Sequence, residues 1–194
     1  MSHYIANLRD IEFCLFDLLG RDKVMGQSLY SEVDRDTAMG MLEEMKRLCE
    51  NDLAASFVEG DRIGTDFNKA TGDVKLPESF KKSYKAYVDG EWWRLDAPVE
   101  LGGMKVPPSV RWAMAEMVLG SNPAIHIYAS GYAFAQVAHV LGTDEQKKIA
   151  KLMVEKHWGA TMQLTEPDAG SDVGAGRSKA VQQPDGTWHI TGTK

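Results

Sequence analysis

A helical pattern dominates the chain up to about residue 157, because apolar residues recur there at three- and four-residue spacing. A first helix is predicted over 10–19, with an apolar side made of Ile11, Leu15, Leu18 and Leu19. A second helix would begin at Asp34 or Asp36, either of which can cap it, and run to about Ser56. The stretch 59–75 is rich in glycine, aspartate and threonine, and it predicts a loop.

Proline and glycine mark where the next helices begin and end. Pro77 is favourable in a first helical turn, and the helix that it opens would end at Gly90. The predicted apolar side of this helix consists of Phe80, Tyr84 and Val88. A further helix would start at Pro107 and end at Ser121. Its apolar positions are Val110, Met114, Met117 and Val118.

The stretch 123–141 predicts one long helix that is rich in alanine and other small residues. Small side chains allow a second helix or a ligand to come close to a helix surface. Gly142 would end this helix, and Thr143 with Gln146 has the spacing of a capping box. The capping box predicts that the last helix starts directly after Thr143.

At Gly159 the pattern changes from helical spacing to alternation of polar and apolar residues. The segments 160–165, 177–183 and 187–193 predict strands, and residues 184–186 predict a turn between the last two. The chain is therefore predicted to be mainly α, with a helical domain followed by the first strands of a β domain. Because two or three strands alone are marginally stable in water, we expect this β domain to be incomplete.

Composition excludes several classes of function. The 194 residues are 43% hydrophobic and 26% charged, which is typical of a globular protein. The formal net charge is -6 and no block of lysine and arginine occurs, so binding to nucleic acid or to an anionic membrane surface is not expected. No stretch has the length and apolar character of a membrane span, and the N-terminus does not have the pattern of a signal peptide. We therefore expect a cytoplasmic protein.

The cysteines and histidines give no indication of a metal-binding site. Cys14 lies in an apolar run and predicts a buried reduced thiol, which fits a reducing compartment. Cys14 and Cys49 are far apart, and the five histidines have no metal-ligand spacing. No metal site is expected.

Residues 162–171 form the segment most suggestive of chemistry. Thr165 would place a hydroxyl at the end of a strand, and Gly170 would let the backbone approach a bulky neighbour closely. Ser171 and its backbone N–H could donate hydrogen bonds to a phosphate. The arrangement could hold a cofactor. From the residues alone, an ordinary β-turn with polar ends explains the pattern as well.

The sequence at 164–172, Leu-Thr-Glu-Pro-Asp-Ala-Gly-Ser-Asp, resembles the signature of the acyl-CoA dehydrogenase family, with every fixed position present. Three further segments resemble family patterns in the same order, at 98–103, 141–148 and 188–194. The resemblance extends from about Leu76 to the end of the chain. Residues 1–75 resemble the extended N-terminus of a longer bacterial branch. The implied division is 1–75 for the extension and first helices, 76–157 for the rest of the helical domain, and 158–194 for the start of the central β domain.

The resemblance implies a fold and a reaction. Family members have an N-terminal helical domain, a central β domain and a C-terminal helical domain, with FAD between them. They dehydrogenate acyl-CoA thioesters in fatty acid β-oxidation: a glutamate takes the α proton and the flavin takes the β hydride. Electron-transfer flavoprotein then reoxidises the flavin. The resemblance also implies a homo-oligomer when the protein is full length.

Carried over to this sequence, the resemblance implies that the cofactor-binding residues are Met162, Gln163, Leu164, Thr165, Gly170 and Ser171. Thr165 would donate its hydroxyl to the N5/O4 edge of the flavin. Gly170 and Ser171 would contact the pyrophosphate region, and Ser171 would also contact the bound acyl-CoA. Met162 departs from the aromatic residue often found at its position. A flexible thioether can still pack on a flavin ring.

The helix predicted over 123–141 would line the tunnel for the acyl chain. Gly131 and Ala135 could leave room there for a longer chain. Plain packing of one helix on another explains these small residues equally well.

No catalytic residue is expected in this chain, because the family's catalytic glutamate belongs to the C-terminal domain. Glu166 lies inside the motif, and we expect its role to be structural. The resemblance therefore implies an N-terminal fragment that is inactive alone and retains FAD weakly or not at all. Two alternatives stay open: an acyl-CoA oxidase or flavin monooxygenase of the same fold, and a non-catalytic truncated helical module.

Overall fold

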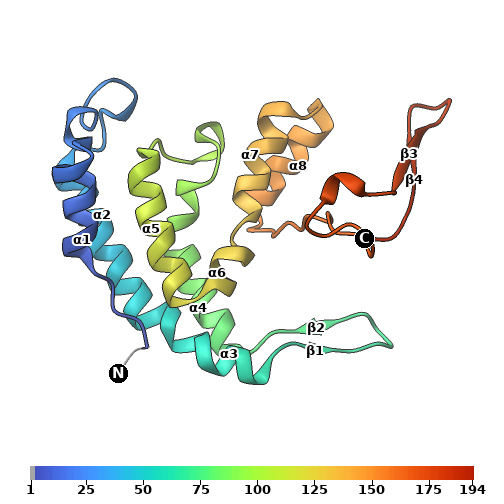
Figure 1. Cartoon of the computed structure of the whole chain (residues 1–194), viewed down its shortest axis with the longest axis horizontal. Helices are drawn as coiled ribbons and strands as arrows, with labels where there is room; N and C mark the ends of the chain where they lie inside the picture. The colour runs from blue at the N-terminus through green and yellow to red at the C-terminus, as the bar shows by residue number, and fades with distance from the viewer. Residues whose placement is uncertain (1–2) are drawn as a thin grey trace. The chain divides into compact units, whose positions relative to one another are not determined.

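The computed structural model describes residues 3–194, which separate into two compact units, one ending at Ala160 and the other running from Thr161 to Lys194. The helices of the first unit are α1 (Leu8–Glu12), α2 (Arg35–Leu48), α3 (Phe57–Ile63), α4 (Glu78–Asp89), α5 (Pro108–Ser121), α6 (Pro123–Tyr128), α7 (Gly131–Leu141) and α8 (Asp144–Glu155) (Figure 1). The mainly α class predicted from the sequence is confirmed. The division at residues 75 and 157 stays a prediction.

Shorter turns and two hairpins complete the secondary structure. The π-helical turns are η1 (Phe13–Leu18) and η4 (Cys49–Leu53). The 3-10 turns are η2 (Arg21–Lys23), η3 (Ser28–Tyr30), η5 (Ala54–Ser56), η6 (Trp92–Leu95), η7 (Val99–Leu101) and, in the second unit, η8 (Val173–Ala175). The strands are β1 (Asp66–Phe67) and β2 (Val74–Lys75) in the first unit, and β3 (Lys179–Gln182) and β4 (Trp188–Thr191) in the second.

Helix α2 supplies one wall of the core. Its N-cap is Asp34, whose carboxylate accepts a hydrogen bond from the Thr37 N–H at 2.8 Å. Its buried residues lie one turn apart on one side, at Ala38, Leu42, Met45 and Leu48. The helix predicted to run to Ser56 continues through η4 and η5, so the predicted extent is confirmed although α-helical bonding ends at Leu48.

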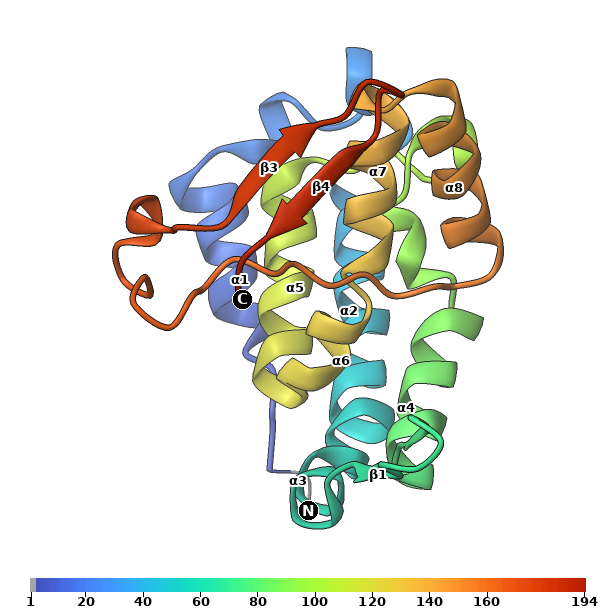
Figure 2. The same ribbon diagram turned by 90° about the vertical axis from the view of Figure 1, so that its right-hand side faces the viewer.

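The core of the first unit forms where α2 packs on α5, and both views show these two helices side by side (Figures 1 and 2). The large side chains buried most completely include Tyr132, Leu42, Met45, Leu53, Met114, Met117 and Ile125. Helix α8 packs against α7 and begins at the predicted capping box. There the Thr143 hydroxyl accepts the Gln146 N–H at 3.3 Å, and the Gln146 side chain accepts the Thr143 N–H at 2.8 Å.

The prediction for the first helix is wrong about which residues form its apolar side. Regular α-helical bonding stops after Glu12, and the wider winding of the π-helical turn η1 changes which residues face the core. Leu15 and Phe16 are buried, whereas Leu18 and Leu19 are exposed.

The prediction for Cys14 is also wrong, because this thiol is exposed. Cys49, in the π-helical turn that follows α2, is the buried one of the two cysteines. Burial raises the pKa of the Cys49 thiol to about 12, so this sulfur stays protonated and unreactive at neutral pH.

The loop predicted over 59–75 contains regular structure at both ends. Helix α3 extends to Ile63 and is ended by Gly64, which has a φ of +67°. Strands β1 and β2 then pair antiparallel, with Asp66 opposite Lys75 and Phe67 opposite Val74. Figure 1 shows this hairpin projecting from the helices of the first unit. The loop prediction is therefore wrong except for the hairpin turn.

The single helix predicted over 123–141 is interrupted, because α6 ends at Tyr128 and α7 begins at Gly131. A Cβ on Gly131 would overlap the backbone oxygen of Trp158. The chain that follows α8 thus lies directly against Gly131 and leaves no room for a side chain there.

The second unit contains one hairpin. Strand β3 pairs antiparallel with β4, in the register Lys179–Thr191, Ala180–Ile190, Val181–His189 and Gln182–Trp188. Gly186 has a φ of +85° and closes the turn by donating its N–H to the Gln183 carbonyl at 3.0 Å. The two strands predicted over 177–183 and 187–193 are present in shorter form.

The strand predicted over 160–165 is not formed. In the described part of the second unit, β3 and β4 pair with each other, and neither of their outer edges pairs with this segment. An alternating pattern alone does not make a strand, because the backbone also needs a partner for its hydrogen bonds.

Candidate functional site

The segment 162–171 begins as extended chain and then closes into a tight turn. Glu166 donates its N–H to the Ala169 carbonyl at 3.0 Å, and Ala169 returns a hydrogen bond from its N–H to the Glu166 carbonyl at 3.1 Å. Pro167 and Asp168 occupy the corners of the turn. Proline at such a corner is favourable because its φ is already fixed near the value that the turn requires.

Inside the turn, the Glu166 carboxylate is surrounded by hydrogen-bond donors. It accepts the backbone N–H of Arg177 at 2.6 Å and that of Ser178 at 3.1 Å. The Lys194 ammonium lies 2.9 Å from the same carboxylate. These donors, first the Arg177 N–H, lower the pKa of Glu166 to about 2. The structural role expected for Glu166 agrees with these contacts.

The predicted cofactor residues lie on the outside of this turn. All of Met162, Gln163, Leu164, Thr165, Gly170 and Ser171 are exposed in the second unit, whereas Glu166 and Ala169 are buried. The motif therefore divides into two parts. Buried residues hold its shape, and exposed residues are free to contact a ligand.

The turn brings Thr165 and Gly170 together, although four residues separate them in the sequence. A Cβ built on Gly170 would lie 4.0 Å from the Thr165 methyl carbon, which is ordinary van der Waals contact. Gly170 is thus a glycine that the fold of this unit does not require. Gly131 and Gly192 differ, because a Cβ at either one would overlap a neighbouring atom.

Sequence reasoning missed Lys194. Its Nζ donates to the Leu164 carbonyl at 2.9 Å and reaches the Glu166 carboxylate at the same distance. The pattern at 188–194 includes this lysine, but spacing along the chain does not indicate a contact between residues so far apart.

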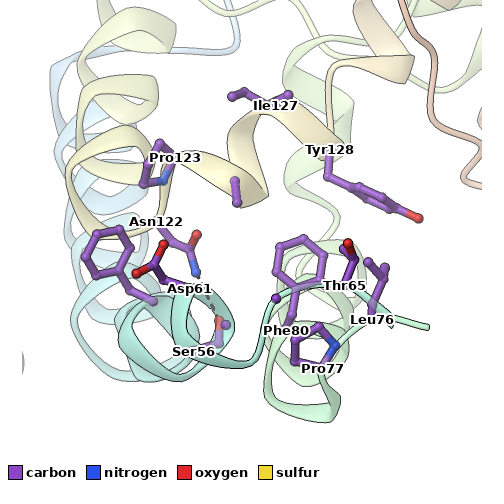
Figure 3. Close-up of a pocket in the computed structure, with 14 residues that line it drawn as sticks. Ser56, Asp61, Thr65, Leu76, Pro77, Phe80, Asn122, Pro123, Ile127 and Tyr128 are labelled. Atoms are coloured by element: carbon purple, nitrogen blue, oxygen red, sulfur yellow. Dashed lines mark hydrogen bonds between the residues drawn. The ribbon is translucent and has the colours of Figure 1, made fainter. Parts of the chain in front are cut away.

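The first unit contains an apolar groove of about 440 Å³ (Figure 3). It lies between α3, the start of α4 and α6. Its lining residues are Ser56, Phe57, Gly60, Asp61, Gly64, Thr65, Leu76, Pro77, Phe80, Asn122, Pro123, Ala124, Ile127 and Tyr128. The surface of the lining is mostly apolar, and its polar side chains are Ser56, Asp61, Thr65 and Asn122.

Asn122 organises one side of the groove. Its side-chain N–H groups donate to the Leu53 carbonyl at 3.1 Å and to the Ser56 hydroxyl at 3.0 Å. Figure 3 shows the bond to Ser56. Asn122 and Ser56 are both buried, so these bonds satisfy polar groups that would otherwise be costly to bury. They tie the junction of α5 and α6 to the end of η4 and to η5, beside the groove.

The predicted acyl-tunnel residues separate in the structure. Gly131 and Ala135 are buried in helix packing and do not line the groove. Residues of α6, at Pro123, Ala124, Ile127 and Tyr128, do line it. On α7 itself, the Tyr132 hydroxyl lies 2.8 Å from His157 Nδ1 and the Tyr132 ring stacks on Trp93, so this region is occupied by the protein's own side chains.

Within residues 3–194, no three His, Cys, Asp or Glu side chains gather in a way that could hold a metal ion. None of the helices in this described range combines the length and apolar character needed to cross a bilayer.

No family model matches the chain. Individual proteins do. A broad-specificity linear acyl-CoA dehydrogenase, FadE5, of Mycobacterium tuberculosis is 55% identical over 194 residues, which is 100% of this chain and 32% of that protein. Over its whole length the chain is similar to a protein named as an acyl-CoA dehydrogenase. A 3-methylmercaptopropionyl-CoA dehydrogenase of Ruegeria pomeroyi is 36% identical over 98% of this chain and 32% of that protein.

A butyryl-CoA dehydrogenase of Syntrophomonas wolfei is 27% identical over 100% of this chain and 33% of its own length. The chain thus spans about a third of the length of the curated acyl-CoA dehydrogenases that it matches. The family resemblance predicted from the motif is confirmed.

Proposed function

We propose that this chain forms part of a flavin enzyme that dehydrogenates linear acyl-CoA thioesters at the α and β carbons, as in fatty acid β-oxidation. The observation that carries the proposal is the 55% identity, over all 194 residues, to an enzyme named for linear acyl-CoA substrates. The exposed side chains of the segment 162–171 support it, because they offer the kinds of group that a flavin would need.

The exposed residues fit FAD by their chemistry. Met162 and Leu164 offer apolar surface for the flavin ring. Thr165 offers a hydroxyl donor for the polar edge of the ring, and Ser171 offers a hydroxyl and an N–H for the pyrophosphate and the acyl-CoA. Gly170 has space beside it for a close approach. Bound FAD would supply the acceptor for the β hydride.

We assign the acyl chain to the groove between α3, α4 and α6. Its lining is apolar, and burying methylene groups there would favour binding by about 0.8 kcal/mol for each group. With this assignment, the start of the stretch 123–141 keeps its predicted role of lining the site for the acyl chain. It leaves Gly131 and Ala135 with a packing role.

The proposal includes the rest of the family's chemistry. The base that removes the α proton lies outside these 194 residues, so the chain alone turns over no acyl-CoA and retains FAD weakly. Electron-transfer flavoprotein reoxidises the flavin, and the whole enzyme is a cytoplasmic homo-oligomer. The coverage of only 32% of FadE5 supports the view that one third of such an enzyme is insufficient.

A chimera tests the proposal. The part of FadE5 that matches this chain is replaced by these 194 residues, and the purified chimera is assayed with linear acyl-CoA thioesters and an artificial electron acceptor. We expect turnover, and we expect Thr165→Val to reduce it. A chimera that folds and binds flavin but dehydrogenates no acyl-CoA would contradict the proposal. Oxygen consumption in the absence of the acceptor would identify an oxidase instead.

A further inference from the structure

Three segments of the second unit meet at one buried carboxylate. Glu166 is 8% exposed, and its two carboxylate oxygens accept the N–H groups of Arg177 and Ser178 at the entry to β3. Lys194, which follows β4, places its Nζ 2.9 Å from Glu166 Oε1. A Cβ on Gly176 would lie 3.1 Å from the same oxygen, so the backbone before β3 also packs on the carboxylate.

Lys194 holds the chain on both sides of Thr165. Its Nζ donates to the carbonyl of Leu164, the residue before Thr165, and contacts the side chain of Glu166, the residue after it. One ammonium group therefore fixes the backbone that carries the Thr165 hydroxyl. The side chains of the Lys194–Glu166 pair are 35% and 7% exposed, so the pair is more buried than the exposed ion pairs that contribute little to stability.

The same carboxylate controls where Gly170 lies. The backbone bonds between Glu166 and Ala169 close the turn, and Gly170 follows directly. Because the turn begins at the anchored residue, any movement of Glu166 moves both Thr165 and Gly170. The two proposed cofactor contacts thus share one support.

We propose that Glu166 and Lys194 form a positioning clamp that fixes Thr165, Gly170 and Ser171 in the arrangement required for the cofactor. The clamp rests on the proposed function for its purpose, but its geometry exists in the flavin-free chain. Neither residue is proposed to touch the flavin or the substrate. Lys194 acts through Glu166 and through the Leu164 carbonyl.

The test uses the isotopically labelled 194-residue chain without flavin, followed by NMR. Glu166→Gln keeps the size of the side chain and removes its charge, and Lys194→Met removes the ammonium. We expect amide exchange at Arg177 and Ser178 to rise about tenfold or more in Glu166→Gln, because hydrogen bonds to a charged acceptor are the strong ones. We also expect the amide signals of Thr165, Gly170 and Ser171 to shift in both variants.

Asp168→Asn is the matched control. Asp168 is a second carboxylate of the same turn, and it pairs with the Arg177 side chain at 3.5 Å on an exposed surface. Its replacement should leave Thr165, Gly170 and Ser171 unchanged. Lys194→Arg should restore the wild-type signals in large part. The double variant of Glu166→Gln and Lys194→Met should show less than the sum of the two single effects, because both remove one interaction.

Two results would overturn the clamp: unchanged signals of Thr165, Gly170 and Ser171 in both single variants, or additive effects in the double variant. If Glu166→Gln unfolds the second unit, Lys194→Met and its arginine rescue decide the question alone. A separate titration with FAD tests the proposed function. The amide signals of Thr165, Gly170 and Ser171 could stay unchanged on addition of FAD while the effects of the clamp variants persist. That result would contradict the proposed cofactor without contradicting the clamp.

Discussion

The two units of the chain are stabilised in different ways. The helical unit buries a continuous set of apolar side chains from α2, α5 and the helices around them. In the unit from Thr161 to Lys194, the buried residues are Glu166 and Ala169, and apolar side chains such as Ile190 lie on the surface. The first unit is organised by apolar burial and the second by hydrogen bonds to one carboxylate. In the second unit, hydrogen bonds to Glu166 therefore hold the turn that carries the predicted cofactor residues.

The largest expected difference between the units concerns apolar truncation. Leu42→Ala should lower the free energy of unfolding of the helical unit by about 2–5 kcal/mol, because Leu42 is fully buried and its loss leaves a cavity. Ile190→Ala in β4 should change stability by no more than about 0.5 kcal/mol, because Ile190 is exposed. Thermal unfolding followed by circular dichroism measures both. Equal losses in the two variants would break the comparison.

A smaller difference is expected between two glycines. Gly131→Ala should destabilise the helical unit by about 1–3 kcal/mol, because the added Cβ would overlap the backbone at Trp158, which must shift. Gly170→Ala should leave stability unchanged, since its Cβ meets only the Thr165 methyl group at 4.0 Å. In the FadE5 chimera, the Gly170 variant should instead lower flavin content. A chimera that keeps its full flavin content would show that close approach at Gly170 is not used.

A further effect, confined to the second unit, is expected from acid. Donors around Glu166 hold its pKa at about 2, below its ordinary 4.5, so its contribution to the second unit is present above pH 4.5 and lost as the pH falls toward 2. NMR signals of Arg177 and Ser178 should follow this titration, and Glu166→Gln should abolish it. Signals that titrate near pH 4.5 in the wild-type chain would show that the carboxylate is not held by these donors.

Local patterns predicted the helices that local chemistry determines. Asp34 caps α2, and Thr143 with Gln146 starts α8, because a cap depends only on residues within one turn. The break before Gly131 was not predicted, and the residue that packs closest there, Trp158, follows α8 and lies outside the local sequence pattern. The prediction of the apolar side of the first helix was wrong because a π-helical turn changes the residue spacing on which that prediction relied.

The candidate site was predictable in its exposed part only. The motif identified Thr165, Gly170 and Ser171 as residues free to bind, and their roles stay predictions. Its support was not predictable, because Lys194 reaches the Leu164 carbonyl across 30 residues of sequence. The strand predicted over 160–165 was wrong because alternation describes side chains, whereas a strand also needs a backbone partner.

The most direct test of the central claim is anaerobic reduction of the flavin in the FadE5 chimera by a linear acyl-CoA. If the exposed face of 162–171 holds FAD for acyl-CoA dehydrogenation, the chimera will purify with flavin and the oxidised flavin absorption will bleach when substrate is added. Thr165→Val should slow the bleaching while Asp168→Asn leaves it unchanged. A folded chimera that lacks flavin, or whose flavin stays oxidised, would contradict the account.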